Sequence, residues 1–376
     1  MTVEARSFYP WLAVAGLVLL VTAAALAGQA GPLGAPPAAH PSSIGSGYYP
    51  PIGFGGYHWQ GAHIAQISAD WQVPTPSTDR PFATASTWIG LQDAGSGPFI
   101  QVGATETAYD AAGHRNWCAL FWSDTQHQFH PQDFADIACG DAVAASMTLG
   151  SRGWTLRIRD TTDGTAYAVT IPHSEHERFT LGEWLQEDPS AGLASGADLP
   201  YPTTTPVTLS DLRVNGAIPT LGRSDGIVLA SPNGIFQVPT PESDDSFSLA
   251  YPQGEALQYL HGANVVDAAA NQFSEALTQW SSLSPGQRRT IVTAYIRALR
   301  VGNRMILTLS LPPGQNRYLV SFAAENTRLE EKLGAWRSQG LQLSDSAYRE
   351  AFDPQDARLY EADVTMVRQA VGLPPV

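Results

Sequence analysis

The amino-acid sequence predicts a mainly β protein: an antiparallel β-sandwich followed by an α-helical C-terminal region. The chain of 376 residues contains 34 Gly, 28 Pro, 10 Trp and 13 Tyr, a composition that favours turn-rich β architecture. Short segments of alternating apolar and polar residues, separated by turn residues, run from His58 to about Pro252. Helical periodicity replaces this pattern afterwards, so we expect a sandwich domain over 58–253 and a helical region over 254–376.

The strongest β signal is a hairpin. Residues 154–159 alternate apolar and polar, residues 160–164 read DTTDG, and alternation resumes over 167–171. A turn that ends in Asp-Gly between two alternating segments is typical of a β-hairpin. Other strands are predicted at 62–73, 84–92, 99–108, 115–123, 142–149, 206–214, 226–230 and 246–251. This number of short strands indicates an antiparallel sandwich or barrel.

Four segments near the C-terminus have apolar residues at helical spacing: 264–281, 285–302, 318–338 and 356–371. Ser284 followed by Pro285 is a favourable N-cap and first helical position. We expect these segments to form a small helical domain or a helical layer packed on the sandwich.

The N-terminus predicts export. Residues 8–28 are almost wholly apolar and uncharged, Arg6 precedes them, and small residues at 25, 27, 28 and 30 provide sites for signal peptidase. The segment is also long enough to span a bilayer. Residues 1–30 are therefore a signal peptide or a membrane anchor, and both alternatives place the remaining chain outside the cytoplasm. Residues 31–57, rich in Gly, Pro and Ser, are predicted to be a mobile linker.

Charge and cysteine content limit which partners and which cysteine redox states are possible. Residues 1–254 hold 23 acidic and 9 basic residues, whereas residues 255–376 hold 12 of each. An acidic surface of this kind argues against nucleic acid as a partner and is best tolerated at low pH. The two cysteines, Cys118 and Cys139, allow one disulfide or two buried thiols.

Common hydrolase and metal motifs are missing from the sequence: it has no GxSxG, HExxH or Walker loop. The sequence spacing that most resembles a metal-binding motif is that of His173 and His176. This segment follows a predicted strand and is expected to be a loop. The pairs His58 with His63 and His127 with His130 are weaker candidates. We therefore predict neither a metal nor a cofactor.

Three ordered motifs remain, and they carry a family resemblance. Residues 88–92 read WIGLQ, residues 99–103 read FIQVG, and residues 182–188 read GEWLQED. They resemble the W-[VI]-G, [IL]-Q-x-G and A-E-W-[IL]-x-E motifs of the glutamic peptidases, or eqolisins, in the same order. Looser matches at 70–76, 140–141 and 207–249 extend the resemblance over roughly residues 60–252.

The resemblance implies a two-sheet, concanavalin-like sandwich that cleaves protein or peptide substrates as a monomer. Gln101 and Glu183 match the catalytic pair, Trp88 matches a tryptophan of the substrate cleft, and Trp71, Trp117 and Trp184 are further candidates for substrate contact. A glutamate can take a proton from water and return it to the leaving amine. A glutamine N–H can stabilise the oxyanion. Since free Glu titrates near pH 4.3, activity is expected at acid pH.

Some positions depart from the family pattern. Gln92 replaces an Asp, Ala119 replaces a Glu, and Gly182 replaces the Ala before Glu183. A second hypothesis is therefore a non-catalytic sandwich that binds carbohydrate or peptide, with Trp71, Trp88, Trp117 and Trp122 stacking on sugars. A peptidase requires Gln101 and Glu183 to converge on one water, whereas a binding sandwich does not.

Overall fold

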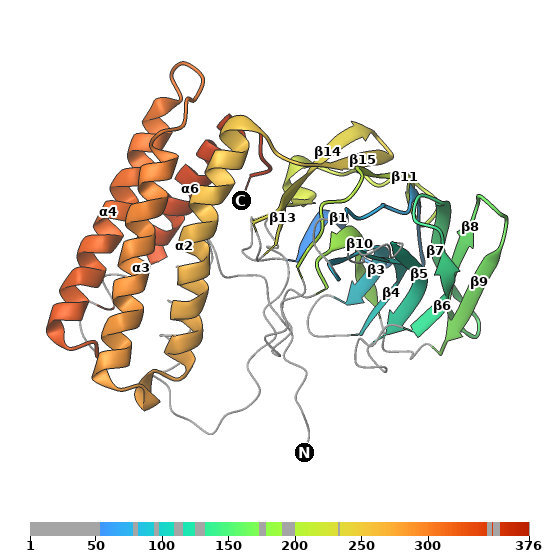
Figure 1. Ribbon diagram of the computed structural model, residues 1–376, viewed down its shortest axis with the longest axis horizontal. Helices are drawn as coiled ribbons and strands as arrows, with labels where there is room; N and C mark the ends of the chain where they lie inside the picture. The colour runs from blue at the N-terminus through green and yellow to red at the C-terminus, as the bar shows by residue number, and fades with distance from the viewer. Residues whose placement is uncertain are drawn as a thin grey trace. The chain divides into compact units, whose positions relative to one another are not determined.

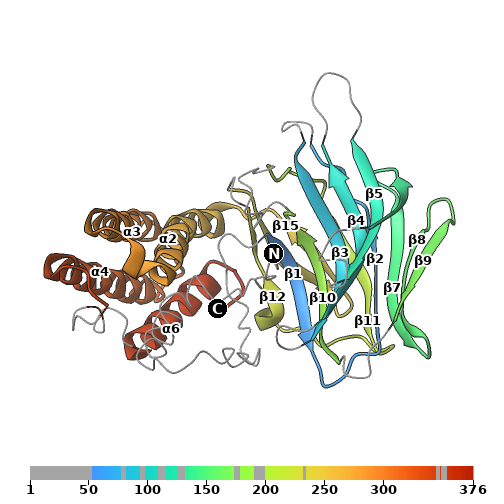
Figure 2. The same cartoon turned by 90° about the horizontal axis from the view of Figure 1, so that it is seen from below.

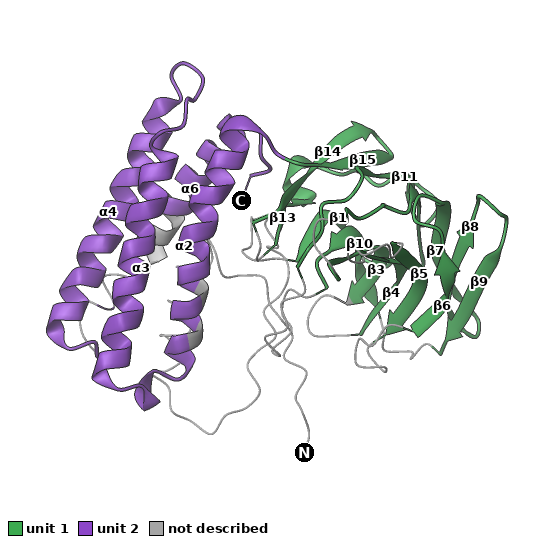
Figure 3. Cartoon of the chain, viewed as in Figure 1, with its two compact units in different colours: residues 1–8, 38–44, 52–251 green, residues 9–37, 45–51, 252–376 purple. Residues whose placement is uncertain are grey.

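The computed structural model describes residues 53–77, 82–93, 98–108, 116–124, 132–172, 178–189, 200–231, 234–343, 348 and 354–375. These residues form two compact units, a β unit that ends at Tyr251 and a helical unit that starts at Pro252 (Figure 3). The apolar segment predicted at residues 8–28 lies outside the described residues. Within the described part of the chain, no helix is long and apolar enough to cross a membrane.

The β unit contains two antiparallel sheets (Figure 1). The first has seven strands in the order β12-β1-β10-β3-β4-β5-β6. Their bounds are β1 Phe54–Gln60, β3 Thr84–Asp93, β4 Phe99–Thr107, β5 Trp117–Asp124, β6 Gln132–Ile137, β10 Phe179–Glu187 and β12 Gly226–Ile227. Its central strands β10, β3 and β4 carry the three motifs.

The second sheet has eight strands in the order β13-β14-β15-β11-β2-β7-β8-β9. Its part from β11 to β9 is labelled in Figure 2. Their bounds are β2 Gln66–Gln72, β7 Ala142–Gly150, β8 Gly153–Asp160, β9 Ala166–Ile171, β11 Val207–Val214, β13 Leu229–Ala230, β14 Phe236–Ser243 and β15 Ser246–Ala250. A short 3-10 helix, η2, spans Arg223–Asp225.

The core lies between the two sheets, which confirms the predicted sandwich. Ile89 and Val102 from the first sheet and Met147 and Leu156 from the second belong to one buried apolar cluster. Alternate residues of each strand point to opposite sides of a sheet. The seven-stranded sheet therefore has an inner face toward this core and an outer face that points away from it.

The predicted hairpin is confirmed as β8 and β9. Residues 154–159 pair with residues 166–171, and the Asp160 carboxylate accepts hydrogen bonds from the backbone N–H groups of Thr162 and Asp163, at 2.8 and 3.3 Å. Such side-chain bonds to the backbone two or three residues on stabilise a tight turn. Besides β1, three strands were not predicted: β10, β6, in which half of the residues are polar, and β14, which contains Pro239 and Pro241.

Strand β1 begins at Phe54, inside the segment predicted to be a linker. Residues 54–60 pair with residues 181–187 of β10. The glycines that resembled a linker allow close packing here. A Cβ atom on Gly55 would lie 2.7 Å from the Leu229 side chain, and one on Gly56 would lie 2.1 Å from the Trp184 carbonyl oxygen. Composition alone could not separate this use of glycine from flexibility.

The helical unit contains α2 (Gly254–Thr278), α3 (Pro285–Ile306), α4 (Asn316–Gln339) and α6 (Pro354–Ala370). Phe273, Trp280 and Trp336 lie in its buried core. The predicted capping of α3 is present: the Ser284 hydroxyl accepts a hydrogen bond from the Gln287 backbone N–H, and the Gln287 side chain accepts one from the Ser284 N–H. Helix α2 starts ten residues before the predicted boundary at 264.

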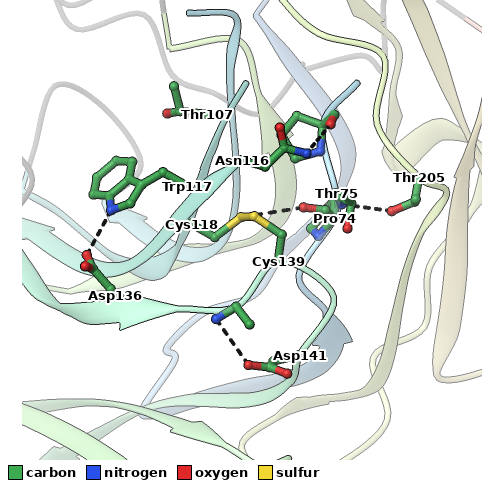
Figure 4. The surroundings of a disulfide bond; sticks show 12 residues. Pro74, Thr75, Thr107, Asn116, Trp117, Cys118, Asp136, Cys139, Asp141 and Thr205 are labelled. Atoms are coloured by element: carbon green, nitrogen blue, oxygen red, sulfur yellow. Dashed lines mark hydrogen bonds between the residues drawn. A yellow bond between two sulfur atoms is a disulfide. The ribbon is translucent and has the colours of Figure 1, made fainter. Parts of the chain in front are cut away.

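A disulfide joins Cys118, on β5, to Cys139, just after β6 (Figure 4). This is the first of the two alternatives that the sequence left open. The bond closes a separation of 21 residues and ties the end of β6 back to its neighbouring strand.

Candidate active site

Strand register brings the two predicted catalytic residues to one face. Glu183 on β10 lies opposite Gly90 on β3, and Gly90 lies opposite Gln101 on β4. Directly paired residues of antiparallel strands project to the same side of a sheet. Glu183 and Gln101 are therefore both on the outer face, separated by two strand spacings of about 4.8 Å each. Gly90 places no side chain between them.

The same line of register pairs continues on both sides. His58 on β1 lies opposite Glu183, and Ser123 on β5 lies opposite Gln101. We call His58, Glu183, Gly90, Gln101 and Ser123 the polar row. It crosses five adjacent strands of the seven-stranded sheet. An imidazole, a carboxyl group, an amide and a hydroxyl are thereby aligned on one surface.

An apolar cluster lies beside the polar row on the outer face. It contains Trp88, Phe121, Leu185 and Ile227, with Phe54 and Phe99 packed against it. The Trp88 ring reaches over Gly90: a Cβ atom there would lie 2.5 Å from the indole and 3.1 Å from the Phe99 ring. Glycine is thus the residue that lets the indole lie against the backbone between Glu183 and Gln101.

Burial and charge strongly perturb the two glutamates of β10. Burial, reinforced by the Glu187 carboxylate, raises the pKa of Glu183 to about 8. Burial raises the pKa of Glu187 to about 7, even though the Trp88 indole N–H donates a 2.8 Å hydrogen bond to its carboxylate and favours the ionised form. Both side chains are therefore protonated at acid pH.

Gln101 is held in a defined orientation. Only 7% of the residue is exposed, and its Nε2 atom donates a 2.8 Å hydrogen bond to the Ser123 hydroxyl oxygen. A primary amide has two N–H donors, so a second one remains for a ligand. The amide oxygen is buried and has no hydrogen-bond partner among the described residues.

The tryptophans proposed to contact substrate do not gather at this site. Trp71 and Trp184 lie in the core between the sheets, so the prediction that they contact substrate is wrong. The reason for Trp184 is strand geometry, because neighbours along a strand point to opposite faces and Trp184 follows Glu183. Trp117 lies at the far end of β5, where its indole N–H donates to Asp136. Of the four, Trp88 alone belongs to the cluster beside the polar row.

Two of the three departures from the family pattern, Gln92 and Ala119, also lie on the outer face. Gln92 lies two residues after Gly90 on β3 and is opposite Leu181 and Phe99. Ala119 is opposite Thr105. The sequence predicts His58 only as a weak metal ligand and does not single out Glu187 as a site residue. The spacing of Glu183 and Glu187, four residues apart on one strand, could have placed both carboxyl groups on the same face.

None of the described residues forms a group of three His, Cys, Asp or Glu side chains suited to a metal ion. His63 is exposed, whereas His58 is buried in the polar row, so these two do not act as a pair. The pairs His173 with His176 and His127 with His130 lie outside the described residues.

Comparison with known proteins gave matches to solved structures. No protein-family model matches the chain, and no curated protein matches it. A scytalido-glutamic peptidase with a peptide-based transition state analogue is 19% identical (TM-score 0.41), and one with a transition state analogue inhibitor is 18% identical (TM-score 0.43). SCP-B, an eqolisin in complex with the tripeptide Ala-Ile-His, is 17% identical (TM-score 0.39). Each match covers 53% of this chain and 98% of that structure.

Proposed function

We propose that this protein is a peptidase that hydrolyses peptide bonds at the polar row, with Glu183 and Gln101 as its catalytic residues. The observation that carries the proposal is the register Glu183–Gly90–Gln101, which puts a carboxyl group and an amide on one face with no side chain between them. The ordered motifs of the sequence support the same chemistry. The substrates proposed are proteins and peptides.

Gln101 has the properties of an oxyanion donor. Its amide is nearly buried and is fixed by the hydrogen bond to Ser123. A preorganised donor in a site with little water stabilises the negative charge that develops on the carbonyl oxygen, and the loss of one such donor costs about 3 kcal/mol of activation free energy. Ser123 acts here as a positioning residue.

Glu183 has the properties of a proton-transfer group. Its carboxyl group can give a proton to the leaving amine and, when ionised, can take one from the attacking water. The raised pKa changes the pH dependence expected from sequence. If Glu183 also takes the proton from water, it must be deprotonated for that step, so the rate would rise as the pH increases through about 8. The expected optimum then moves from acid pH to mildly alkaline pH.

A carbohydrate-binding function finds no comparable support at this site. Trp88, the tryptophan beside the polar row, is only 2% exposed, and its indole N–H is bonded to Glu187. A ring packed in this way does not offer an open face on which a sugar could stack.

The test is cleavage of an unfolded protein by the purified full chain between pH 3 and pH 9. We expect activity in the wild type and a loss of 10²-fold or more in Glu183→Gln, the range for removal of a general acid or base. Glu242→Gln is the matched control, because Glu242 is an exposed glutamate of β14 in the same sandwich. A folded wild-type protein without activity at any pH, or a Glu183→Gln variant with full activity, would refute the proposal.

A further inference from the structure

His58 is the remaining titratable member of the polar row, and its surroundings are unusual. The residue is 6% exposed, and its Nδ1 atom is buried without a hydrogen-bond partner in the part of the chain that the structure describes. A buried polar atom of this kind normally has a partner in the protein or in bound water. An unpartnered imidazole nitrogen beside a candidate active site therefore indicates an acceptor or donor position for a ligand.

The position of His58 relative to Glu183 follows from the sheet. The two residues are directly opposite each other on β1 and β10. Directly opposed residues have Cβ atoms about 5 Å apart and project to the same face. His58 and Glu183 are thus paired residues on the outer face, and Gln101 lies on the other side of Glu183 across Gly90.

We propose that His58 is the general base of the peptidase reaction and that Glu183 is the matching general acid. This inference rests on the proposed function and assigns the two proton transfers to two neighbouring residues. His58 takes a proton from the attacking water as its oxygen bonds to the peptide carbonyl carbon. The carbon–nitrogen bond then breaks, and the Glu183 carboxyl group gives its proton to the leaving amine.

The adjacency of the two residues also accounts for the return to the starting state. After the bond has broken, His58 carries the proton taken from water and Glu183 is ionised. The proton passes from the imidazolium to the neighbouring carboxylate, and both residues regain their initial protonation states. The overall reaction consumes one water and yields one carboxylic acid and one amine, with no other reactant.

The electrostatics agree with this division of roles. Burial lowers the pKa of His58, while the nearby Asp225 carboxylate opposes that change. Burial and Glu187 raise the pKa of Glu183. The groups that face His58 are Glu183 from β10 and Asp225 from η2, and Arg223 also lies nearby on η2, where it acts on the adjacent Tyr57. Near neutral pH His58 is therefore a neutral base and Glu183 a neutral acid.

The proposal predicts a bell-shaped pH dependence of kcat/KM for peptide cleavage by the wild-type chain. The acid limb belongs to His58, which must be neutral, and the alkaline limb belongs to Glu183, which must be protonated near pH 8 or below. If Glu183 were the base, kcat/KM would instead rise through the same pH without an alkaline fall.

Two variants test the assignment. His58→Gln should lower kcat/KM at pH 7 by 10²-fold or more while circular dichroism remains that of the wild type. Asp225→Asn, which does not touch the reacting atoms, should shift the acid limb to lower pH, because the carboxylate that stabilises the imidazolium is gone. This second variant tests His58 even if His58→Gln does not fold, and a purely structural role would not move the limb.

The outcomes separate this inference from the proposed function. An active, folded His58→Gln protein beside an inactive Glu183→Gln protein would overturn the role of His58 and leave the peptidase proposal intact. An acid limb unmoved by Asp225→Asn would also overturn it. An inactive wild type would refute the proposed function itself.

Discussion

The seven-stranded sheet carries a buried or half-buried glutamate on each of its two faces. Glu183 lies on the outer face in the polar row, whereas Glu106 lies on the inner face of β4 and is 0% exposed. Burial raises the pKa of both carboxyl groups above the usual range. Their register neighbours differ: Glu183 is opposite His58 and Gly90, while Glu106 is opposite Ala85 and Cys118.

This difference shows why a raised pKa alone does not identify a catalytic carboxyl group. Desolvation acts on any carboxylate inside a protein. Catalysis also requires neighbours that can bind or move the other reacting groups, together with access for a substrate. Glu183 has an imidazole on the paired strand and an amide across Gly90, on a face turned away from the core. Glu106 is instead enclosed in the interior, where Thr87 and Tyr201 lie near it.

The largest difference between the two faces should appear when their glutamines are replaced. Gln101→Leu on the outer face should lower kcat by about 10²–10³-fold, the usual effect of losing an oxyanion donor. Gln186→Leu provides the matched control, because Gln186 is fully buried on the inner face of β10, two strands away from β4 in the same sheet. Steady-state peptide cleavage checks both variants. Equal losses of kcat would mean that the amide on the outer face has no special role.

Removal of the disulfide should affect stability rather than chemistry. Cys118 lies on the inner face of β5, and its register partner on β4 is Glu106. The bond closes a separation of 21 residues, so the Cys118→Ala/Cys139→Ala double variant should lose about 3 kcal/mol of unfolding free energy. Denaturant unfolding measures this loss. A variant that keeps its stability but loses kcat would contradict the separation of the two faces.

Gly90→Ala should disturb the outer face locally. The new methyl group would lie 2.5 Å from the Trp88 indole, so the ring must move away from the position in which it bonds Glu187. Such overpacking typically costs about 1–3 kcal/mol of stability. Thermal unfolding and kcat/KM should both decrease. Gly150→Ala is the control, because its nearest contact would lie at 3.7 Å; similar losses in both variants would argue against the close approach at Gly90.

The last predicted effect concerns Glu106 and depends on pH. Its pKa is raised in the folded protein, so the folded state keeps a proton that the unfolded state releases above about pH 4.5. The wild type should therefore lose stability as the pH rises, by at most about 1.4 kcal/mol per pH unit from this group. Glu106→Gln should match the wild type at pH 4 and unfold at a higher temperature at pH 8. The same difference at both pH values would contradict this account.

Much of the fold was predictable from local patterns. Period-two alternation located strands such as β3, β4 and β8, because a half-buried strand must place apolar residues on its inner face. The motifs around Gln101 and Glu183 identified the two residues that register later brought to one face. Strand β1 was not recognised, because its glycines serve close contacts with Trp184 and Leu229 that involve distant parts of the sequence.

The remaining members of the site depend on the same long-range pairing. His58 becomes a neighbour of Glu183 only when β1 pairs with β10, over a separation that no local pattern reveals. The error over Trp184 was avoidable. A tryptophan that directly follows Glu183 on a strand must point to the opposite face. The burial of Trp71 could not be predicted in this way, because local sequence does not show which face of the second sheet meets the core.

The most direct test of the account compares the two glutamates in one assay. The kcat/KM for cleavage of an unfolded protein is measured at pH 7 for the wild type, Glu183→Gln and Glu106→Gln, with folding checked by circular dichroism. We predict a loss of 10²-fold or more for Glu183→Gln and a value near that of the wild type for Glu106→Gln. Equal activity of the two folded variants would contradict the assignment of catalysis to the polar row.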